Sequence, residues 1–528
     1  MIDGQQRITA LMTAIAGKTI INAEYKPDRI KIAFNPFAAL SNEPDAEIFA
    51  VQDQSHVNDK RWISDISLVF KNEFNSWAFV DTYCKANPEI DPNTLSSAIT
   101  ALKEIGNRRI GVIELTENLD IDIVTDIFIR INSQGTALSQ GDFVMSKIAA
   151  DTDHGGKNLR KLIDYFAHLS KVPAFHPVLL ETDKEFANSE YMRKLDWLQH
   201  ETESVYDPDC DDVIRVAFML QNYRSKLSEL VLLLSGRDFK NREYKEEIVQ
   251  QSFSNLEKGV LEVVNENNFK QFMLTIRGAG FVSPKLANSN MALDFAYMLF
   301  LRLLNSDCNH NEAKRIVQKW YVLSVLTGRY SASPESAFGR DLKRISEVGI
   351  PSALAEFEST TLSDTFWQAT IPDRLRYNVT NSPVYQVYLA AQIAAGDVSL
   401  LSANVKVEDL LTIQGDVHHI FPKKYLIEHG RQKNQYNQNA NFALLDTDVN
   451  KSIGKKSPKD YFALAFKQCE TGVAECGTIM DRIQLLDNLR TNCIPEAIVD
   501  WDVDNYETFL AERRLLMAQK IKNYYNHL

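Results

Sequence analysis

The stretch DVHHIFPKK at residues 416–424 decides how the C-terminal part of this chain folds. β-Branched residues on both sides of two adjacent histidines favour an extended strand. Successive side chains of a strand point to opposite faces, so at most one of His418 and His419 can be buried in the core behind it. The other histidine is therefore available for chemistry.

Polar residues follow this stretch in a defined order. NFALL at 441–445 reads as a second strand, and Asp448 and Asn450 lie in the helical segment after it. Hydrolysis of a phosphodiester needs a general base, a cation that stabilises developing negative charge, and residues that hold the cation. A strand with histidines, a second strand and a helix carrying Asn can supply all three.

Each polar residue in this region suits one of these roles. His419 fits the general base, because an unperturbed histidine pKa of roughly 6.5 lets it accept a proton near neutrality. His418 and Asn450, helped by Asp448, suit Mg²⁺, Mn²⁺ or Zn²⁺. Asn441 is expected to orient His419 or to brace the loop. The alternative is a structural histidine pair, with the Asn residues as caps and turns.

Charge is distributed unevenly along the chain. The whole chain carries a net charge of -12, which is unfavourable for binding nucleic acid. Residues 416–460 contain eight Lys or Arg and five acids, so this segment is locally positive at +3. The expected phosphate contacts in it are Lys423, Lys424, Lys451 and Lys455.

Bulk composition bounds the protein class. A chain of 528 residues predicts two or three domains, and 45% hydrophobic with 24% charged residues is typical of a soluble globular protein. Without an apolar run of 18 residues or a signal sequence, we expect a cytoplasmic protein with no membrane contact. The six cysteines form no Cys-x-x-Cys pair, which argues against a zinc ribbon or a disulfide framework.

The N-terminus carries a polar run before a helix. Apolar residues at 8, 11, 12 and 15 have helical spacing, so DGQQR at residues 3–7 lies at or just before a helix N-terminus. Free N–H groups and an arginine there would suit a phosphate. From local chemistry alone, a capped helix start with Arg7 in a surface ion pair is the simpler explanation. The candidate phosphate ligands are Asp3, Gly4, Gln5, Gln6 and Arg7.

The remaining chain divides into three expected domains. Strands near 29–34 and 47–51 predict a small mixed α/β domain over 1–150, followed by an irregular helical domain over 151–398. In that second domain Arg329, beside tyrosine and serines, is a candidate phosphate contact. Residues 399–528 form the third domain, and apolar residues at helical spacing from Phe509 to Tyr524 predict a closing helix. The expected class is α+β, predominantly helical.

The C-terminal residues resemble a known nuclease motif. HHIFP at 418–422, NFALL and NKSIG at 450–454 are similar to the ββα-metal motif, also called HNH or His-Me finger. In that motif the second residue of an Asp/His-His pair is the general base, the first is a metal ligand, and an Asn or His on the helix is another ligand. The resemblance therefore implies that His419 is the base, that His418 and Asn450 hold the cation, and that Asn441 supports them.

Three further motifs widen the resemblance. DGQQR, FIRINSQGTAL at 128–138 and GRYS at 328–331 are similar to GmrSD-type proteins of modification-dependent restriction and phage defence. In that family a ParB/sulfiredoxin-like domain with DGQQR precedes an HNH domain. The resemblance implies that the first domain binds an NTP and senses modified phage DNA.

The chain departs from that family at its start. Relatives carry a strand and an aromatic, Arg-containing motif before DGQQR, whereas here DGQQR begins at residue 3. Part of the N-terminal domain is therefore expected to be missing. The gene product is then truncated, its start is mis-called, or a partner supplies the missing part. Because two cuts in a duplex need two active sites or two visits, a homodimer is also an open expectation.

We therefore expect this protein to be a metal-dependent DNA endonuclease of a phage-restriction system. Two other readings of the sequence stay open. One is a truncated nucleic-acid sensor without catalysis, which the missing N-terminal strand suggests. The other is an RNA-cleaving toxin, because the ββα-metal site does not by itself select its polymer.

Overall fold

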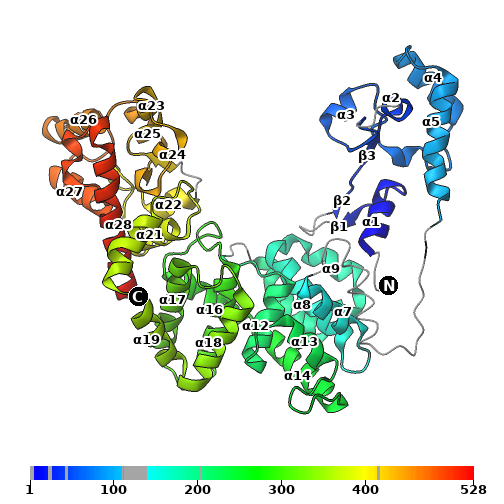
Figure 1. Ribbon diagram of the computed structural model, residues 1–528, viewed down its shortest axis with the longest axis horizontal. Coiled ribbons are helices and arrows are strands. Elements are labelled where there is room, and N and C mark those ends of the chain that lie inside the picture. The colour runs from blue at the N-terminus through cyan, green and yellow to red at the C-terminus, as the bar shows by residue number, and fades with distance from the viewer. Residues whose placement is uncertain are drawn as a thin grey trace. The chain divides into compact units, whose positions relative to one another are not determined.

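The computed structural model describes residues 5–21, 27–41, 46–109, 111, 139–201, 205–412 and 417–528. The chain divides into two compact units, Met1–Leu138 and Ser139–Leu528 (Figure 1). In the described residues of both units helices predominate, and the strands are short and pair in twos. The predicted α+β class with a helical majority is confirmed.

The first unit mixes strands and helices, as the sequence predicts. Its elements are α1 (Gln5–Ala14), β1 (Ile20–Ile21), β2 (Pro27–Asp28), β3 (Ile32–Phe34), α2 (Pro36–Leu40), β4 (Phe49–Val51), α3 (Gln54–Asn58), α4 (Ser76–Ala86) and α5 (Pro92–Glu104). Strands β3 and β4 pair antiparallel, with Phe34 opposite Phe49. Phe34 belongs to a buried cluster with Leu95, Ile99 and Leu102, which lie on one face of α5. The strand pair and the apolar helix face thus form one small core.

The helical part of the second unit runs up to residue 394. It comprises α7 (Gln140–Ala150), α8 (Gly156–Lys171), α9 (His176–Thr182), α10 (Lys184–Ala187), α11 (Glu190–Leu195), α12 (Cys210–Asn222), α13 (Leu227–Leu234), α14 (Glu246–Val263), α15 (Glu266–Gly278), α16 (Asn290–Leu304), α17 (His310–Thr327), α18 (Pro334–Val348), α19 (Ile350–Thr361), α20 (Ile371–Arg374) and α21 (Pro383–Ala394). Helix α7 begins with a capping box in which Ser139 accepts from the N–H of Asp142.

A buried ionic cluster joins two central helices of this part. Nη1 of Arg215 in α12 donates to Oδ1 of Asp212 at 2.9 Å and to Oδ2 of Asp294 in α16 at 2.6 Å. The hydroxyl of Tyr206 donates to the other oxygen of Asp294 at 2.7 Å. Burial raises the pKa of both carboxyl groups. Such a cluster favours one packing of α12 against α16, because Arg215 must lie within hydrogen-bonding distance of a carboxyl group on each helix.

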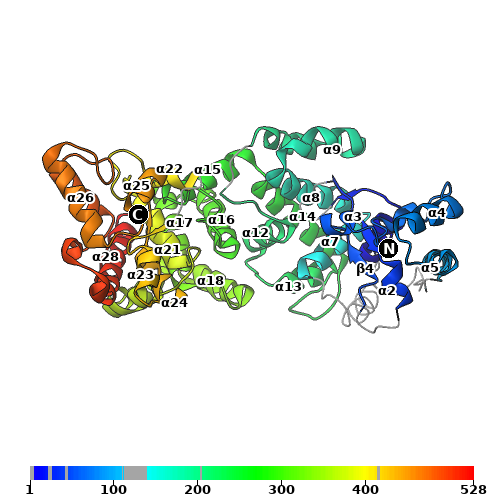
Figure 2. The ribbon, with the colours of Figure 1, turned by 90° about the horizontal axis from the view of Figure 1, so that it is seen from above.

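The C-terminal part of the second unit holds the histidine pair. Its elements are α22 (Val407–Thr412), β5 (Val417–His419), α23 (Lys423–Glu428), α24 (Lys433–Tyr436), β6 (Phe442–Leu444), α25 (Thr447–Ile453), α26 (Pro458–Thr471), α27 (Arg482–Thr491) and α28 (Tyr506–His527). Helix α28, the predicted closing helix, packs along α21, and the two lie side by side in both views (Figure 1, Figure 2).

The buried apolar side chains of the second unit form one continuous cluster across residue 398. The three-domain division therefore stays a prediction. All six cysteines are free thiols. Within the described ranges no helix is both long enough and apolar enough to cross a membrane.

Candidate active site

Two short strands and a helix form the frame of the candidate site. Strands β5 and β6 pair antiparallel, with His418 opposite Ala443 and His419 opposite Phe442. Helix α25 begins just after β6, where the Asp446 side chain accepts from the N–H of Asp448 at 2.9 Å. The local order is thus strand, strand, helix, which is the order that the sequence pattern predicts.

His419 is half-buried and held by three neighbours. Its Nε2 lies 2.8 Å from Oδ1 of Asn437. The rings of Phe442 and Tyr436 meet the imidazole edge-on, with centroids at 5.2 and 5.9 Å. Burial lowers the pKa of His419, the charge of Lys423 adds to that effect, and the Asn437 hydrogen bond opposes it. A lowered pKa keeps the imidazole neutral at pH 7, the state in which it can accept a proton.

Nε2 of His418 is buried and forms no hydrogen bond with any residue that the structure describes. Burial, followed by the neighbouring His419, lowers the pKa of His418 to about 4. A neutral imidazole with an unsatisfied ring nitrogen is what a cation requires of a histidine ligand.

The other predicted metal ligands are placed less favourably. Asn450 is half-buried on α25, whereas the Asp448 side chain is 90% exposed and pairs with Lys451 at 3.3 Å. No cluster of three His, Cys, Asp or Glu suited to a metal occurs in the described part of the chain. A cation at His418 would thus depend on an amide oxygen and water for its other ligands, which suits Mg²⁺, Mn²⁺ or Zn²⁺ with open positions.

Asn441 lies in the core and braces the loop before β6. Its Oδ1 accepts from the N–H of Phe421 at 2.9 Å, and its Nδ2 donates to the carbonyls of Phe421 at 3.2 Å and Tyr436 at 3.0 Å. Its described hydrogen bonds thus join the segment after His419 to α24 rather than contacting His419. Of the two roles expected for Asn441, the geometry favours bracing.

We expect Asn441→Ala to lower the free energy of unfolding by about 2 kcal/mol, because one N–H and two carbonyls lose a buried partner. Urea unfolding followed by circular dichroism measures the change. Asn434→Ala is the matched control, since Asn434 lies exposed on α24. Equal midpoints for the two variants would contradict the bracing role.

Helix α28 holds this loop through hydrogen bonds to the backbone carbonyls of the loop and its flanking residues. Nη1 of the buried Arg513 donates to the carbonyls of Ala440 and Phe442, both at 2.7 Å. The hydroxyl of Tyr506 donates to the carbonyl of Gln435 at 3.0 Å. Helix α28 therefore holds the segment between α24 and β6, on which the partner of His419 lies.

Sequence reasoning missed both Asn437 and Arg513. The segment 433–442 reads KNQYNQNANF, and four asparagines in ten residues signal a hydrogen-bonded loop. That signal predicts polar contacts without saying which residue each one meets. Arg513 carries no comparable signal, because an arginine within an amphipathic helix is usually solvated.

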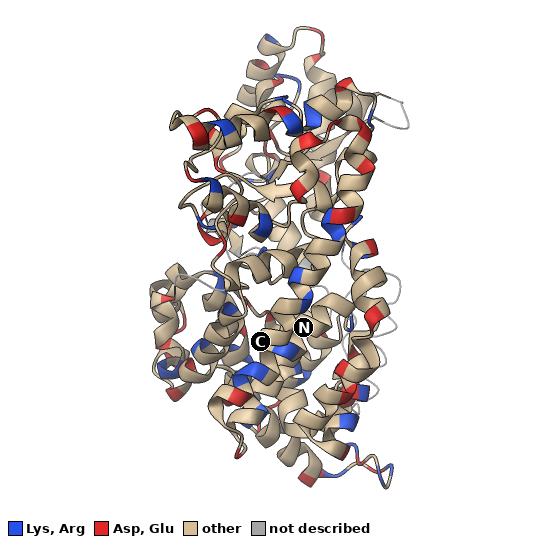
Figure 3. Cartoon of the chain, turned by 90° about the vertical axis from the view of Figure 1, so that its left-hand side faces the viewer, with Lys and Arg blue, Asp and Glu red and all other residues tan. Residues whose placement is uncertain are grey.

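The predicted phosphate contacts near the site are exposed lysines. Lys423 and Lys424 begin α23, and Lys423 also lies over the ring of Tyr436 at 5.7 Å. Lys451 and Lys455 form surface ion pairs, with Asp448 at 3.3 Å and Glu428 at 3.2 Å. Such pairs contribute little, so a phosphate could displace the carboxylates at small cost. Figure 3 shows Lys and Arg interspersed with Asp and Glu along the helices.

Arg329 is engaged by a protein carboxylate. Its guanidinium makes a two-pronged ion pair with the buried Asp341, and its Nε donates at 2.7 Å. It also lies over the ring of Phe357 at 3.9 Å. This geometry gives Arg329 a structural role between α17, α18 and α19, and it does not support the predicted phosphate contact.

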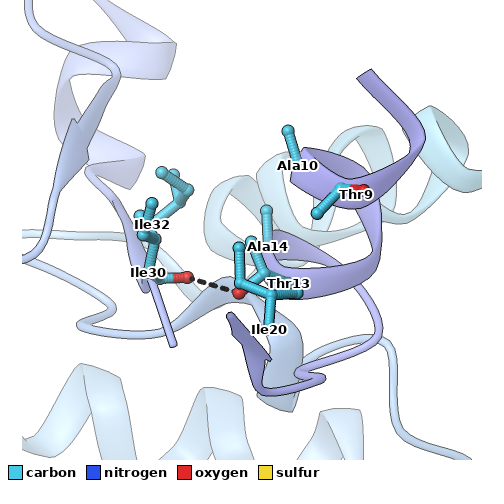
Figure 4. Close-up of a pocket in the computed structure, with 7 residues that line it drawn as sticks. All are labelled: Thr9, Ala10, Thr13, Ala14, Ile20, Ile30 and Ile32. Atoms are coloured by element: carbon cyan, nitrogen blue, oxygen red, sulfur yellow. Dashed lines mark hydrogen bonds between the residues drawn. The ribbon is translucent and has the colours of Figure 1, made fainter. Parts of the chain in front are cut away.

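The N-terminal motif is described in part. Asp3 and Gly4 lie outside the described residues, and Gln5 and Gln6 are described as helical backbone. Arg7 is exposed in the first turn of α1. An open pocket of about 520 Å³ lies between α1 and three isoleucines, where Thr13 Oγ1 donates to the carbonyl of Ile30 at 3.5 Å (Figure 4). Its lining is Thr9, Ala10, Thr13, Ala14, Ile20, Ile30 and Ile32. None of these side chains is charged, and none belongs to DGQQR; nucleotide binding by that segment stays a prediction.

Comparison with known proteins bears on the first unit. Residues 1–149 match the family model described as GmrSD restriction endonuclease, N-terminal domain. No curated protein matches the chain. The match includes both DGQQR and FIRINSQGTAL, the second of which lies outside the described residues.

Proposed function

We propose that this protein is a metal-dependent endonuclease that cuts DNA as part of a restriction system directed against phage. One observation carries the proposal. On a strand, strand and helix frame, a histidine held by an amide stands beside a second histidine whose buried Nε2 has no hydrogen-bond partner among the described residues. The similarity of residues 1–149 to the N-terminal domain of a restriction endonuclease supports the choice of DNA.

In the proposed reaction His419 acts as general base. The imidazole takes a proton from a water molecule whose oxygen forms a bond to phosphorus, while the bond from phosphorus to a sugar oxygen breaks. His418 and Asn450 would hold the cation, with Asp448, whose Oδ1 lies 3.3 Å from Nζ of Lys451, as a further candidate ligand. A bound divalent cation stabilises negative charge on the phosphate and on the leaving oxygen.

The surroundings of the site favour a polyanionic substrate. The positive charge of Lys423 reaches the imidazole, since it helps to lower the pKa of His419. Lys424, Lys451 and Lys455 extend the positive charge on α23, α25 and the turn after α25. We further propose that the N-terminal unit selects modified DNA and that an NTP regulates it through the DGQQR segment.

Cleavage assays on three polymers test this function. Phage DNA with modified bases, unmodified plasmid and a structured RNA are incubated with the full chain, in Mg²⁺, Mn²⁺ or Zn²⁺ and with or without NTP. We expect cleavage of DNA that EDTA abolishes. Cleavage of RNA with DNA left intact would overturn the assignment to DNA. The absence of any cleavage in all three metals, with and without NTP, would overturn the proposed nuclease function.

A further inference from the structure

One ring nitrogen of His419, Nε2, has a side-chain partner in the structure. Nε2 faces Oδ1 of Asn437 at 2.8 Å. An amide oxygen can only accept a hydrogen bond, so this contact requires a hydrogen on Nε2. In a neutral imidazole the other nitrogen, Nδ1, then carries the lone pair. One hydrogen bond thus decides which nitrogen of His419 can act as a base.

Asn437 is held on both sides along the chain. It follows α24, and its N–H donates to the carbonyl of Lys433 at 3.0 Å. The preceding carbonyl, on Tyr436, accepts from Nδ2 of Asn441 at 3.0 Å. The next side chain, Gln438, accepts from Nη2 of Arg514 in α28 at 2.5 Å. The amide of Asn437 is therefore presented to His419 by a segment with little freedom to move.

The aromatic neighbours of His419 fix the ring plane but not its two-fold orientation. Phe442, the cross-strand partner, stands perpendicular to the imidazole, and Tyr436 meets it at 65°. Rotation of the ring by 180° would preserve these apolar contacts while exchanging the positions of nitrogens and carbons. Of the described neighbours, Asn437 is the one whose hydrogen bond distinguishes the two orientations.

We propose that Asn437 is a positioning residue, which holds His419 in the tautomer with hydrogen on Nε2 and leaves Nδ1 free to take the proton from water. The catalytic consequence rests on the proposed nuclease function, whereas the tautomer does not. Asn437 acts by orienting the imidazole of His419, as hydrogen-bond partners of functional histidines do.

Nitrogen NMR of the metal-free protein tests the tautomer directly. The full chain is labelled with ¹⁵N-histidine, and the His419 signals are assigned by their loss in His419→Ala. We expect Nε2 to give the protonated, pyrrole-type signal and Nδ1 the unprotonated, pyridine-type signal. If the hydrogen resides on Nδ1 in the wild type, Asn437 presents its amide nitrogen instead, and the proposal is overturned.

Variants of Asn437 test whether this residue sets the tautomer of His419. Asn437→Leu removes the acceptor and should give a mixture of tautomers, whereas Asn437→Asp keeps an oxygen at this position and should retain hydrogen on Nε2. Asn434→Ala, on the short helix that precedes Asn437, should leave the signals unchanged. A Leu variant with the wild-type tautomer would show that another group sets it. If Asn437→Leu fails to fold, the wild-type and Asn437→Asp spectra still decide the outcome.

Kinetics then separate positioning from binding. We expect Asn437→Leu to lower kcat on DNA by about 10- to 100-fold with little change in KM, because the base is misoriented while phosphate contacts remain. Asn437→Asp should recover part of the loss. If Asn437→Leu alters the tautomer of His419 but leaves kcat unchanged, Asn437 has no role in catalysis. No activity in the wild type would instead disprove the nuclease, and the NMR result would still stand.

Discussion

His419→Ala is expected to reduce metal-dependent cleavage of DNA by about 10²- to 10⁴-fold, the range that a general base contributes. The imidazole is the group at the site whose protonation and orientation are both set by the structure. Burial keeps it neutral at pH 7, and Asn437 and two aromatic rings hold it in place. Initial rates of plasmid nicking under saturating Mg²⁺ or Mn²⁺ measure the loss.

The matched control for that variant is His429→Ala. His429 is exposed at the end of α23, and its Nδ1 contacts the carbonyl of Tyr425 at 2.8 Å, so its loss should leave the cleavage rate unchanged. DNA affinity, measured by fluorescence anisotropy in Ca²⁺, should be similar for both variants. Cleavage by His419→Ala at the wild-type rate would exclude His419 as the base.

Replacement of Arg513 is expected to have the largest effect on stability. Arg513→Ala leaves the carbonyls of Ala440 and Phe442 without a donor, removes a contact to the carbonyl of Asn492 at 3.3 Å, and opens a cavity. Arg513 is 1% exposed, so these hydrogen bonds lie away from bulk water in the wild-type chain. We expect a loss of about 3 to 5 kcal/mol in the free energy of unfolding.

Two further variants identify the cause of that loss. Arg513→Met keeps much of the side-chain volume but has no hydrogen-bond donors. It should therefore recover the part of the unfolding free energy that Arg513→Ala loses through the cavity, but not the part lost with the hydrogen bonds. Lys522→Ala, on the same helix, removes a half-buried cation 3.8 Å from Asp364 and should shift the urea midpoint only slightly. If Arg513→Ala unfolds at the wild-type midpoint, α28 does not hold the loop that carries Asn437.

Local sequence patterns determined the order of elements around the site. The extended run at 416–424, the apolar run at 441–445 and the polar helix after it are local signals, because each depends on neighbouring residues. They predict the strand pair and α25, which the structure contains with His418 and His419 on β5. The same kind of signal predicts α28 through its apolar spacing.

Tertiary packing decided which polar groups meet. Arg329 beside tyrosine and serines suggests a phosphate contact, but packing of α18 brings Asp341 to its guanidinium. Nothing in the spacing of 18 residues from His419 to Asn437 predicts their 2.8 Å contact. Sequence alone therefore determined which residues could perform the chemistry. Only the packed chain decided which nitrogen of His419 has a partner, because hydrogen bonds across a fold depend on how distant segments are brought together.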